Sequence, residues 1–156
     1  MSTFQYTTLF QLLSEYKNQL DEIILQYSTL LSQLSEAPPL STTLFLSHVH
    51  EIEKMGHIYI CYSKTIENKI YIIGSGTIIY EPKLIRNGKY VGHIEDIVVD
   101  KTYRSMGIAK KIINQLLSFA QEKNCYKVIL HATVEISTFY EKIGFEKHGL
   151  EMSLYF

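Results

Sequence analysis

The run from Ile94 to Lys111, IEDIVVDKTYRSMGIAKK, constrains the fold more than any other part of the chain. Its first half is an apolar strand that ends near Asp100, and an amphipathic helix begins at Ile108. Only a short basic loop separates the two elements. A strand that is followed so closely by an amphipathic helix is typical of an α/β protein, in which helices flank a sheet.

The periodicity of apolar residues predicts the remaining elements. Spacings of three and four from Leu9 to Leu34 indicate one helix, or two helices with a break at Ser28-Thr29. A further helix is expected from an N-cap at Thr42 or Thr43 to Gly56. We predict strands at 57–65, 70–80, 93–100, 126–131 and 149–156, and helices at 108–123 and 136–142. Gly74 and Gly76 mark a bulge or a close approach of backbone in the second strand.

Length and composition exclude several classes of protein. The 156 residues fit one domain, 1–156, and 15 basic against 16 acidic residues leave a net charge of −1. Such a balance provides neither a nucleic-acid-binding arm nor a polybasic membrane anchor. The start of the chain does not resemble a signal peptide, and no apolar run approaches the roughly 20 residues of a membrane span.

The two cysteines, Cys61 and Cys125, lie far apart and form no Cys-x-x-Cys motif, so that neither a disulfide framework nor a zinc site is indicated. Lone thiols suit a reducing compartment. We therefore expect a cytoplasmic protein that holds no metal and contacts neither membrane nor nucleic acid. Cys125 has no positioned histidine nearby, so we expect it to pack and not to act as a nucleophile.

The loop from Arg104 to Ala109, RSMGIA, is the first candidate site. A glycine-containing loop that enters a helix leaves several backbone N–H groups without partners, and these groups and the helix dipole can bind phosphate oxygens. The small residues Gly107 and Ala109 would allow a ligand to reach the backbone. The alternative interpretation is an ordinary strand–turn–helix corner with solvated cations.

Three further runs accompany this loop: GHIEDIVV at 92–99, CYKVIL at 125–130 and FYEKIGF at 139–145. In this order and at these distances, the runs and the Arg-x-x-Gly-x-Ala loop resemble the GNAT superfamily of N-acetyltransferases. Among its members, the resemblance is greatest to those that acetylate glucosamine 6-phosphate on the route to UDP-N-acetylglucosamine. It covers about residues 70–152 and is weak over the first 57 residues.

The resemblance implies a GNAT fold with a mixed, mostly antiparallel sheet of six or seven strands and helices on both faces. It also implies acetyl-CoA as the acetyl donor and a homodimer whose last strand exchanges between subunits. The diphosphate of acetyl-CoA would bind to the loop residues Arg104, Ser105, Met106, Gly107, Ile108 and Ala109. Ile97, Val98 and Val99 would be splayed from the neighbouring strand by a bulge, pair with the pantetheine arm and offer an amide to the thioester carbonyl.

The resemblance assigns roles in the chemistry as well. Tyr140 would donate to the departing sulfur of CoA, since a phenol with a pKa of about 10 can protonate a thiolate whose thiol has a pKa of about 8.5; the alternative is a packed core aromatic. Glu95 and Asp96 would lie at the acceptor amine, although neighbours in a strand point to opposite faces; the alternative is a charge pair with a lysine. Lys83, Arg86, Tyr126 and Lys127 would bind the sugar.

Two positions depart from the pattern of the family. Ile136 replaces an Asn that holds pantetheine, and the C-terminal residues 153–156, SLYF, lack a basic residue that contacts the sugar phosphate. Two rival functions therefore stay open. One is acetyl transfer to another amine, such as a different amino sugar, a polyamine or a protein amino group; the other is non-catalytic binding of acyl-CoA.

Two histidines, His93 and His131, lie in predicted strands near the proposed site. One interpretation of each is a neutral histidine in the core or at its rim, and the other is a proton relay. His48 and His50 do not share a helix face, so we expect no metal site there.

Overall fold

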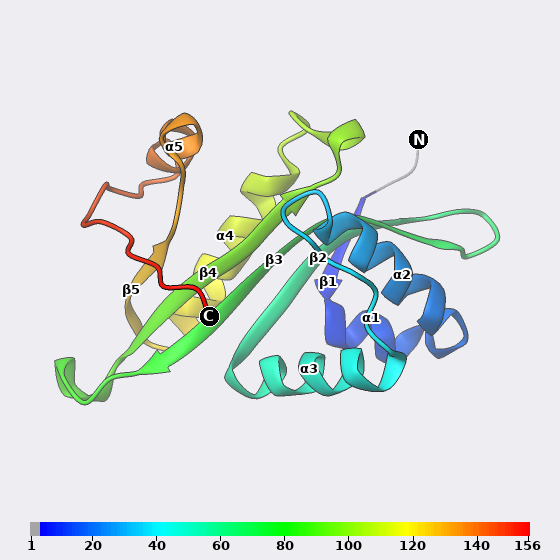
Figure 1. Cartoon of the computed structure of the whole chain (residues 1–156), viewed down its shortest axis with the longest axis horizontal. Helices are drawn as coiled ribbons and strands as arrows, with labels where there is room; N and C mark the ends of the chain where they lie inside the picture. Colours follow the sequence, from blue (N-terminus) through cyan, green and yellow to red (C-terminus); the bar gives the residue numbers. More distant parts are fainter. Residues whose placement is uncertain (1–3) are drawn as a thin grey trace.

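The computed structural model describes residues 4–156, which contain one five-stranded sheet with the strand order β1-β2-β3-β4-β5 (Figure 1). The strands are β1 at Gln5–Thr8, β2 at Gly56–Lys64, β3 at Ile70–Pro82, β4 at Tyr90–Val99 and β5 at Cys125–Leu130. The first four strands pair antiparallel, whereas β4 and β5 pair parallel. The prediction of a mixed, mostly antiparallel sheet is thus confirmed.

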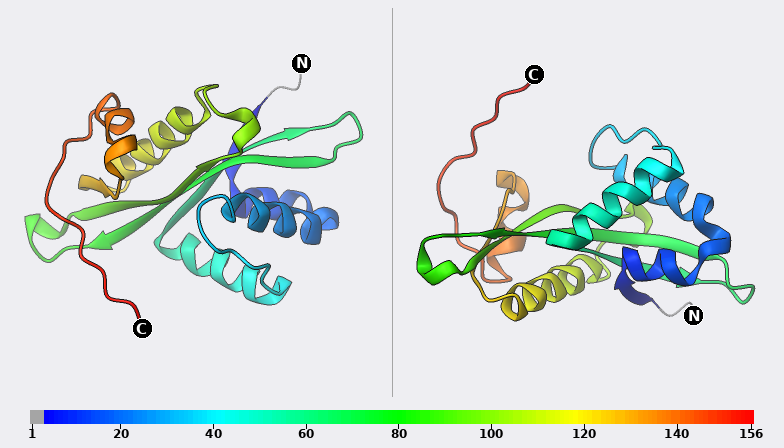
Figure 2. Two further views of the ribbon diagram at one scale, coloured as in Figure 1. Left: turned by 45° about the horizontal axis from the view of Figure 1, so that its top comes forward. Right: turned by 90° about the horizontal axis from the view of Figure 1, so that it is seen from below.

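Helices cover both faces of this sheet. They are α1 at Leu9–Glu15, α2 at Leu20–Leu31, α3 at Thr42–Met55, α4 at Ile108–Glu122 and α5 at Val134–Glu141, and 3-10 turns lie at Lys17–Gln19 (η1), Arg86–Gly88 (η2) and Lys101–Tyr103 (η3). α2 and α3 lie on one face and α4 lies on the other (Figure 2). Within residues 4–156, no helix has both the length and the apolar character that a membrane crossing requires.

Alternating side chains of β2 belong to two separate parts of the core. Ile58, Ile60 and Tyr62 pack with α1, α2 and α3, whereas Cys61 between them belongs to the cluster under α4. α4 contributes its predicted apolar face, of which Ile112, Ile113 and Leu116 are fully buried. Burying a side chain of this size stabilises the fold by about 1.5–3 kcal/mol.

The predicted helix from Leu9 to Leu34 is two helices, and the break lies at Tyr16–Gln19 instead of Ser28-Thr29. Tyr16 leaves the helical region of backbone angles (φ −111°, ψ 49°) and ends α1. Ser28 is buried inside α2 and does not interrupt it. The helix ends at Leu31, so that Leu34 lies beyond it and is exposed.

The N-cap of α3 is Ser41, not Thr42 or Thr43. Its hydroxyl accepts a hydrogen bond from the N–H of Leu44 (3.3 Å). The helix ends before Gly56, as predicted, and β2 begins at that glycine. A Cβ at Gly56 would lie 1.8 Å from the backbone oxygen of Ile78, so only glycine allows the chain to enter the sheet here.

The predicted last strand at 149–156 is not formed, so the sheet has five strands instead of the six or seven expected. The segment crosses in front of β5 and β4 but pairs with neither of them (Figure 1). A segment without a partner has no ladder of hydrogen bonds to hold it as a strand. Its apolar residues Leu154, Tyr155 and Phe156 are 78–115% exposed.

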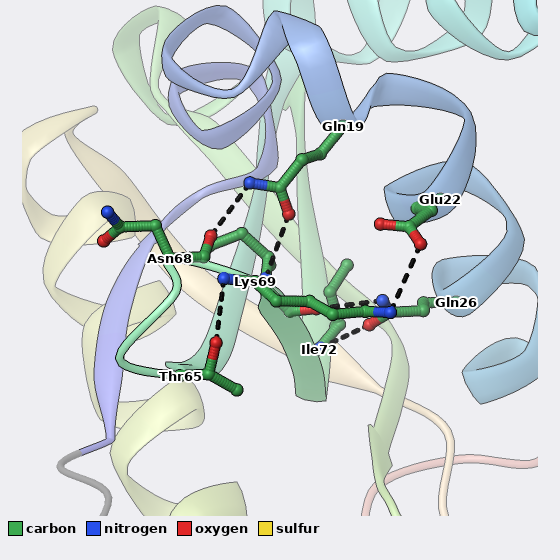
Figure 3. Close-up of polar contacts among 8 residues, drawn as sticks. Gln19, Glu22, Gln26, Thr65, Asn68, Lys69 and Ile72 are labelled. Atoms are coloured by element: carbon green, nitrogen blue, oxygen red, sulfur yellow. Dashed lines mark hydrogen bonds and ion pairs between the residues drawn. The ribbon is translucent and has the colours of Figure 1, made fainter.

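Glutamine side chains cover the edge of β3 where it extends beyond β4 (Figure 3). Nε2 of Gln26 donates to the C=O of Ile70 (2.9 Å), and Oε1 of Gln26 accepts from the N–H of Ile72 (3.1 Å). Gln19 accepts from the N–H of Ile70 (3.1 Å) and donates to the C=O of Asn68 (2.9 Å). These bonds satisfy a strand edge that would otherwise be unpaired, and they tie η1 and α2 to the β2–β3 hairpin.

Candidate active site

A β-bulge interrupts β4 at Asp96. In the register of β3 and β4, the two residues Asp96 and Ile97 of β4 face the single residue Gly76 of β3. Asp96 has a left-handed backbone conformation (φ 53°), which few non-glycine residues adopt. A bulge of this kind bends its strand and increases the local twist, so the last residues of β4 take a new direction.

Gly76 permits this arrangement because it has no side chain, and neighbouring side chains occupy the space where a Cβ would lie. A Cβ at this position would lie 2.4 Å from Cδ1 of Ile97 and 2.9 Å from Cγ2 of Ile112. At Gly74, a Cβ would meet three atoms at 3.2 Å, including the backbone oxygen of Val98. The bulge or close approach predicted for this pair of glycines is confirmed, and α4 lies directly behind the bulge.

β5 separates from β4 at the same place (Figure 1). Their parallel pairing ends at Ile94 and Leu130, whereas β4 continues to Val99. β5 then leads into α5, which lies apart from the end of β4 (Figure 1). The two strands therefore diverge over the last five residues of β4, from Glu95 to Val99.

Backbone groups at the end of β4 point toward the side that β5 has left. The N–H of Asp100 donates to the C=O of Ile73 in β3 (2.8 Å). Because polar backbone groups alternate along a strand, those of Ile97 and Val99 point away from β3. Val98 is buried against the cluster under α1, α2 and α3. The strand end has the splayed geometry that we expected for Ile97, Val98 and Val99.

The loop from Arg104 to Ala109 lies at this end of β4 and leads into α4. Ser105 (φ 63°) and Gly107 (φ 77°) are both left-handed, and Gly107 is the N-cap of α4. A Cβ at Gly107 would meet nothing within 4 Å, so the space over the helix start is open. The first turn of α4 has N–H groups without acceptors in the helix, and the dipole of the 15-residue helix adds positive potential there. Met106 is exposed, Ala109 is half-buried and Ile108 is buried.

Hydrogen bonds fix the start of this loop. Nε of Arg104 donates to the C=O of Val99 (3.3 Å). The carboxylate of Asp100 accepts from the N–H of Thr102 (2.9 Å) and from Nε2 of Gln33 (2.9 Å). The bonds from Thr102, followed by the bond from Gln33, hold the pKa of Asp100 below its usual range. Sequence reasoning missed Gln33, because this residue follows α2 and belongs to no motif.

Tyr140 lies in α5 and is 8% exposed. Its ring packs edge to face against Phe139 (5.1 Å between centroids) and Phe145 (5.9 Å). Burial raises the pKa of the hydroxyl, which therefore stays protonated and able to donate. The ring is thus a core aromatic, while the hydroxyl keeps its proton for a partner.

Both candidate carboxylates, Glu95 and Asp96, are exposed. The alternation that predicted opposite faces for them is interrupted, because Asp96 is the left-handed residue of the bulge. Neither forms an ion pair with another residue of the described chain, 4–156. Burial raises the pKa of Tyr27 to about 12, and the negative charge of Asp96 adds to the rise. The hydroxyl groups of Tyr27 and Ser75 are 3.0 Å apart.

The predicted sugar-binding residues gather at the other end of β4. Cζ of Arg86 lies 5.6 Å from the ring centroid of Tyr126, and Nζ of Lys127 lies 5.8 Å from the same centroid. The ammonium of Lys83 is bound by the carboxylate of Glu81.

This cluster is not adjacent to the bulge. Tyr90 pairs with Cys125, next to Tyr126, and six residues of strand separate Tyr90 from Asp96. Six residues of strand span about 20 Å. The structure therefore brings Arg86, Tyr126 and Lys127 together, but it places them far from Asp96.

Comparison with known sequences agrees with this geometry. The acetyltransferase (GNAT) family matches residues 20–145. A glucosamine 6-phosphate N-acetyltransferase of Trypanosoma brucei brucei is 40% identical over 128 residues, which are 80% of this chain and 84% of the relative. A probable glucosamine 6-phosphate N-acetyltransferase 2 of Oryza sativa subsp. japonica is 35% identical over 132 residues, 83% of this chain and 80% of the relative.

Solved structures give the same result over nearly the whole chain. An acetyltransferase of Trypanosoma brucei superposes with a TM-score of 0.81 at 33% identity, covering 99% of this chain and 100% of the other. Glucosamine-6-phosphate N-acetyltransferase from Arabidopsis thaliana superposes with a TM-score of 0.79 at 27% identity, covering 99% of each chain. By its sequence, its fold and the bulged strand beside the loop into α4, the chain belongs to the GNAT family of acetyltransferases.

Proposed function

We propose that this protein transfers the acetyl group of acetyl-CoA to the amino group of glucosamine 6-phosphate. The bulge at Asp96 and Ile97, opposite Gly76, is the observation that carries the proposal, because it frees the backbone of β4 beside the start of α4. The relatives that are 35–40% identical over most of the chain are named for acetylation of this sugar.

The end of β4 fits an extended acyl donor. The backbone groups of Ile97 and Val99 offer hydrogen bonds to the pantetheine arm, as an added strand would receive them. The loop from Arg104 to Ala109 offers its N–H groups and positive charge to the diphosphate. An N–H group of the bulge, aimed at the thioester carbonyl, would contribute about 3 kcal/mol to the transition state. Ile136 has no side-chain hydrogen-bonding group, so backbone groups or the hydroxyl of Ser137 would hold the pantetheine arm at this position.

The reaction needs no covalent intermediate on the enzyme. The free amine attacks the thioester carbon, the C–N bond forms and the C–S bond breaks. Nitrogen loses one proton in this step and sulfur gains one. Tyr140 is suited to donate to the sulfur, because its packed ring fixes the hydroxyl and burial keeps it protonated. Positioning of the two substrates supplies much of the remaining rate.

The acceptor amine would lie against Glu95 and Asp96. Arg86 and Lys127 lie about 15–20 Å along β4 from Asp96, too far to bind the phosphate of the same sugar within one subunit. Lys83 is neutralised by Glu81, and the C-terminal residues 153–156 carry no cation.

We further propose that residues 1–156 act as a single domain in the cytoplasm and form a homodimer. Leu150, Met152 and the last three residues are exposed and apolar, and the outer edge of β5 has no strand partner among the described residues. If residues 149–156 of a second copy paired with β5, this pairing would cover both the exposed apolar side chains and the outer edge of β5. Light scattering should find a dimer for the full chain and a monomer after deletion of 149–156. A monomeric full chain would contradict the dimer.

The decisive experiment combines binding and turnover. Calorimetry should detect binding of CoA, and CoA release should be measured with glucosamine 6-phosphate, glucosamine, spermidine and a lysine peptide. We expect turnover with glucosamine 6-phosphate and weaker turnover with the sugar that lacks the phosphate. Turnover with only a different amine would identify that amine as the acceptor in place of glucosamine 6-phosphate. Binding of CoA without turnover of any amine would favour a non-catalytic protein that binds acyl-CoA. A folded protein without affinity for CoA would refute the proposal.

A further inference from the structure

His93 and Glu81 form a hydrogen-bonded pair on the face of the sheet that carries Glu95. Nε2 of His93 lies 2.9 Å from Oε2 of Glu81. In the ladder of β3 and β4, His93 pairs with Ile79 and Glu95 pairs with Thr77. His93 and Glu95 are thus two residues apart on one face, and their Cα atoms are separated by about 7 Å.

The pair lies where β4 and β5 begin to separate. His93 is opposite Ile129 of β5, and the pairing ends one residue later at Ile94. The side chain of His93 is 30% exposed, so water can reach its ring. His93 therefore borders the open stretch of β4 where the acceptor amine is proposed to lie.

Glu81 sets the orientation of the imidazole. Hydrogen bonds from Lys83 and then from His93 hold the pKa of Glu81 below its usual range, so that Glu81 is an ionised acceptor at neutral pH. Nε2 of His93 consequently carries the proton that it donates to Glu81, which leaves the lone pair of the neutral ring on Nδ1. An imidazole with one nitrogen held by a carboxylate has a fixed orientation and a defined tautomer.

Charged groups approach His93 from each neighbouring strand. β3 provides Glu81 with its partner Lys83, β4 itself provides Glu95, and β5 provides Lys127, two residues before Ile129. The positive charges of Lys83 and Lys127 balance the negative charges of Glu81 and Glu95 around the ring. Among residues 4–156, Glu81 is the residue whose side chain is hydrogen-bonded to the ring.

We propose that His93, oriented by Glu81, accepts the proton that the acceptor ammonium loses when it becomes the free amine. The N–H bond breaks with its electron pair left on nitrogen, and the proton passes through Glu95 or an adjacent water to Nδ1 of His93. The amine then attacks, its second proton goes to the leaving sulfur, and the imidazolium returns its proton to water. This inference rests on the proposed function, and His93 is a positioning residue because it acts through Glu95 or a water and does not touch the amine itself.

A pH profile of kcat/KM for glucosamine 6-phosphate tests the relay. His93→Gln keeps a donor for Glu81 but cannot take up a proton, so kcat/KM should fall about 100-fold at about pH 6.5. The deficit should shrink at about pH 9, where the acceptor is already the free amine. Glu81→Gln removes the carboxylate that orients the ring, so it should lower kcat/KM in the same pH range as His93→Gln.

His57→Gln is the matched control. His57 also bonds a carboxylate, that of Glu53 (3.1 Å), but this pair joins α3 to the start of β2 and lies outside the proposed site. Its profile should match that of the wild type. Circular dichroism and CoA affinity should show that all three variants are folded.

A deficit of His93→Gln that is the same at every pH would mean that His93 only supports the structure, and it would overturn the relay. An unchanged profile would overturn it equally. The two proposals fail in different ways. If the wild type turns over no amine, the proposed function falls and the relay falls with it; if the wild type is active and the deficit is independent of pH, only the relay falls.

Discussion

Asp96 lies opposite Gly76 across the β3–β4 pair, and each residue makes the conformation of the other possible. Asp96 takes a left-handed conformation (φ 53°) so that β4 can carry one extra residue. Gly76 leaves the space that Ile97 and Ile112 fill. The side chain at position 76 therefore controls the strand end at which we propose the acyl donor binds.

Gly76→Ala should weaken binding of CoA. The new Cβ would lie 2.4 Å from Cδ1 of Ile97, so Ile97 must move and carry the bulge with it. We expect affinity for CoA to fall about 10-fold, equivalent to about 1.4 kcal/mol, and stability to fall by about 1–3 kcal/mol through overpacking. Calorimetry and thermal melts measure the two effects. Gly92→Ala is the control, because its nearest neighbours are side-chain atoms at 3.1 Å or more, away from the bulge. Equal CoA affinity in both variants would contradict the role given to Gly76.

Patterns within one element predicted those elements well. The strand predicted at 57–65 and the amphipathic helix predicted at 108–123 depend on neighbours in sequence, and both were confirmed. β1 was not predicted, because four residues, QYTT, carry too little pattern and are held by pairing with β2. The strand predicted at 149–156 failed for the opposite reason, since its apolar residues have no partner strand within residues 4–156.

At the candidate site, the sequence predicted which segments matter but not how their side chains meet. The glycine pair predicted a close approach in β3 and the resemblance implied a bulge near Ile97, but neither identified Asp96 as the left-handed residue of that bulge. The bonds of Gln33 to Asp100 and of Glu81 to His93 join residues 67 and 12 positions apart. Such contacts depend on the register of packed elements, which no local pattern contains.

Tyr140→Phe should lower kcat and leave affinity for acetyl-CoA nearly unchanged. Phenylalanine keeps the edge-to-face packing against Phe139 and Phe145, so only the proton donor is lost. We expect a loss of about 100-fold in kcat, as for removal of a general acid. Steady-state kinetics and calorimetry separate the two quantities. Tyr71→Phe, at an exposed position of β3, is the control and should keep full activity. Wild-type kcat in the Tyr140 variant would exclude it as the donor.

Gln26→Ala should destabilise the fold without a direct effect on the site. The variant loses the bonds to the C=O of Ile70 and the N–H of Ile72, and it leaves these groups of the β3 edge unpaired. The expected loss is about 1–3 kcal/mol in the free energy of unfolding, measured with urea. Gln26→Glu keeps an acceptor for Ile72 but has no donor for Ile70, so its stability should lie between the two. Gln121→Ala on the exposed face of α4 is the control, and a similar loss there would show that the effect is not due to the strand edge.

Asp100→Asn should destabilise the protein in a way that depends on pH. The pKa of Asp100 is lowered in the folded state, first by the bonds from Thr102 and then by the bond from Gln33. The folded protein thus binds a proton at this carboxyl less readily than the unfolded chain does. The resulting stabilisation is fully present above the unfolded pKa of about 3.9 and is lost as the pH falls through the lower folded pKa.

Urea unfolding of the wild type and Asp100→Asn measures this difference at about pH 7 and at successive values below about pH 4. The wild type should be more stable at neutral pH, and the gap between the two proteins should narrow as the carboxyl is protonated. Asp21→Asn is the matched control, because Asp21 accepts one bond, from the hydroxyl of Thr42 (2.8 Å), far from the loop. A gap for Asp100→Asn that is constant down to low pH would mean that the charge of Asp100 does not hold the loop. A narrowing gap ties the start of the loop to α2 through an ionised carboxylate.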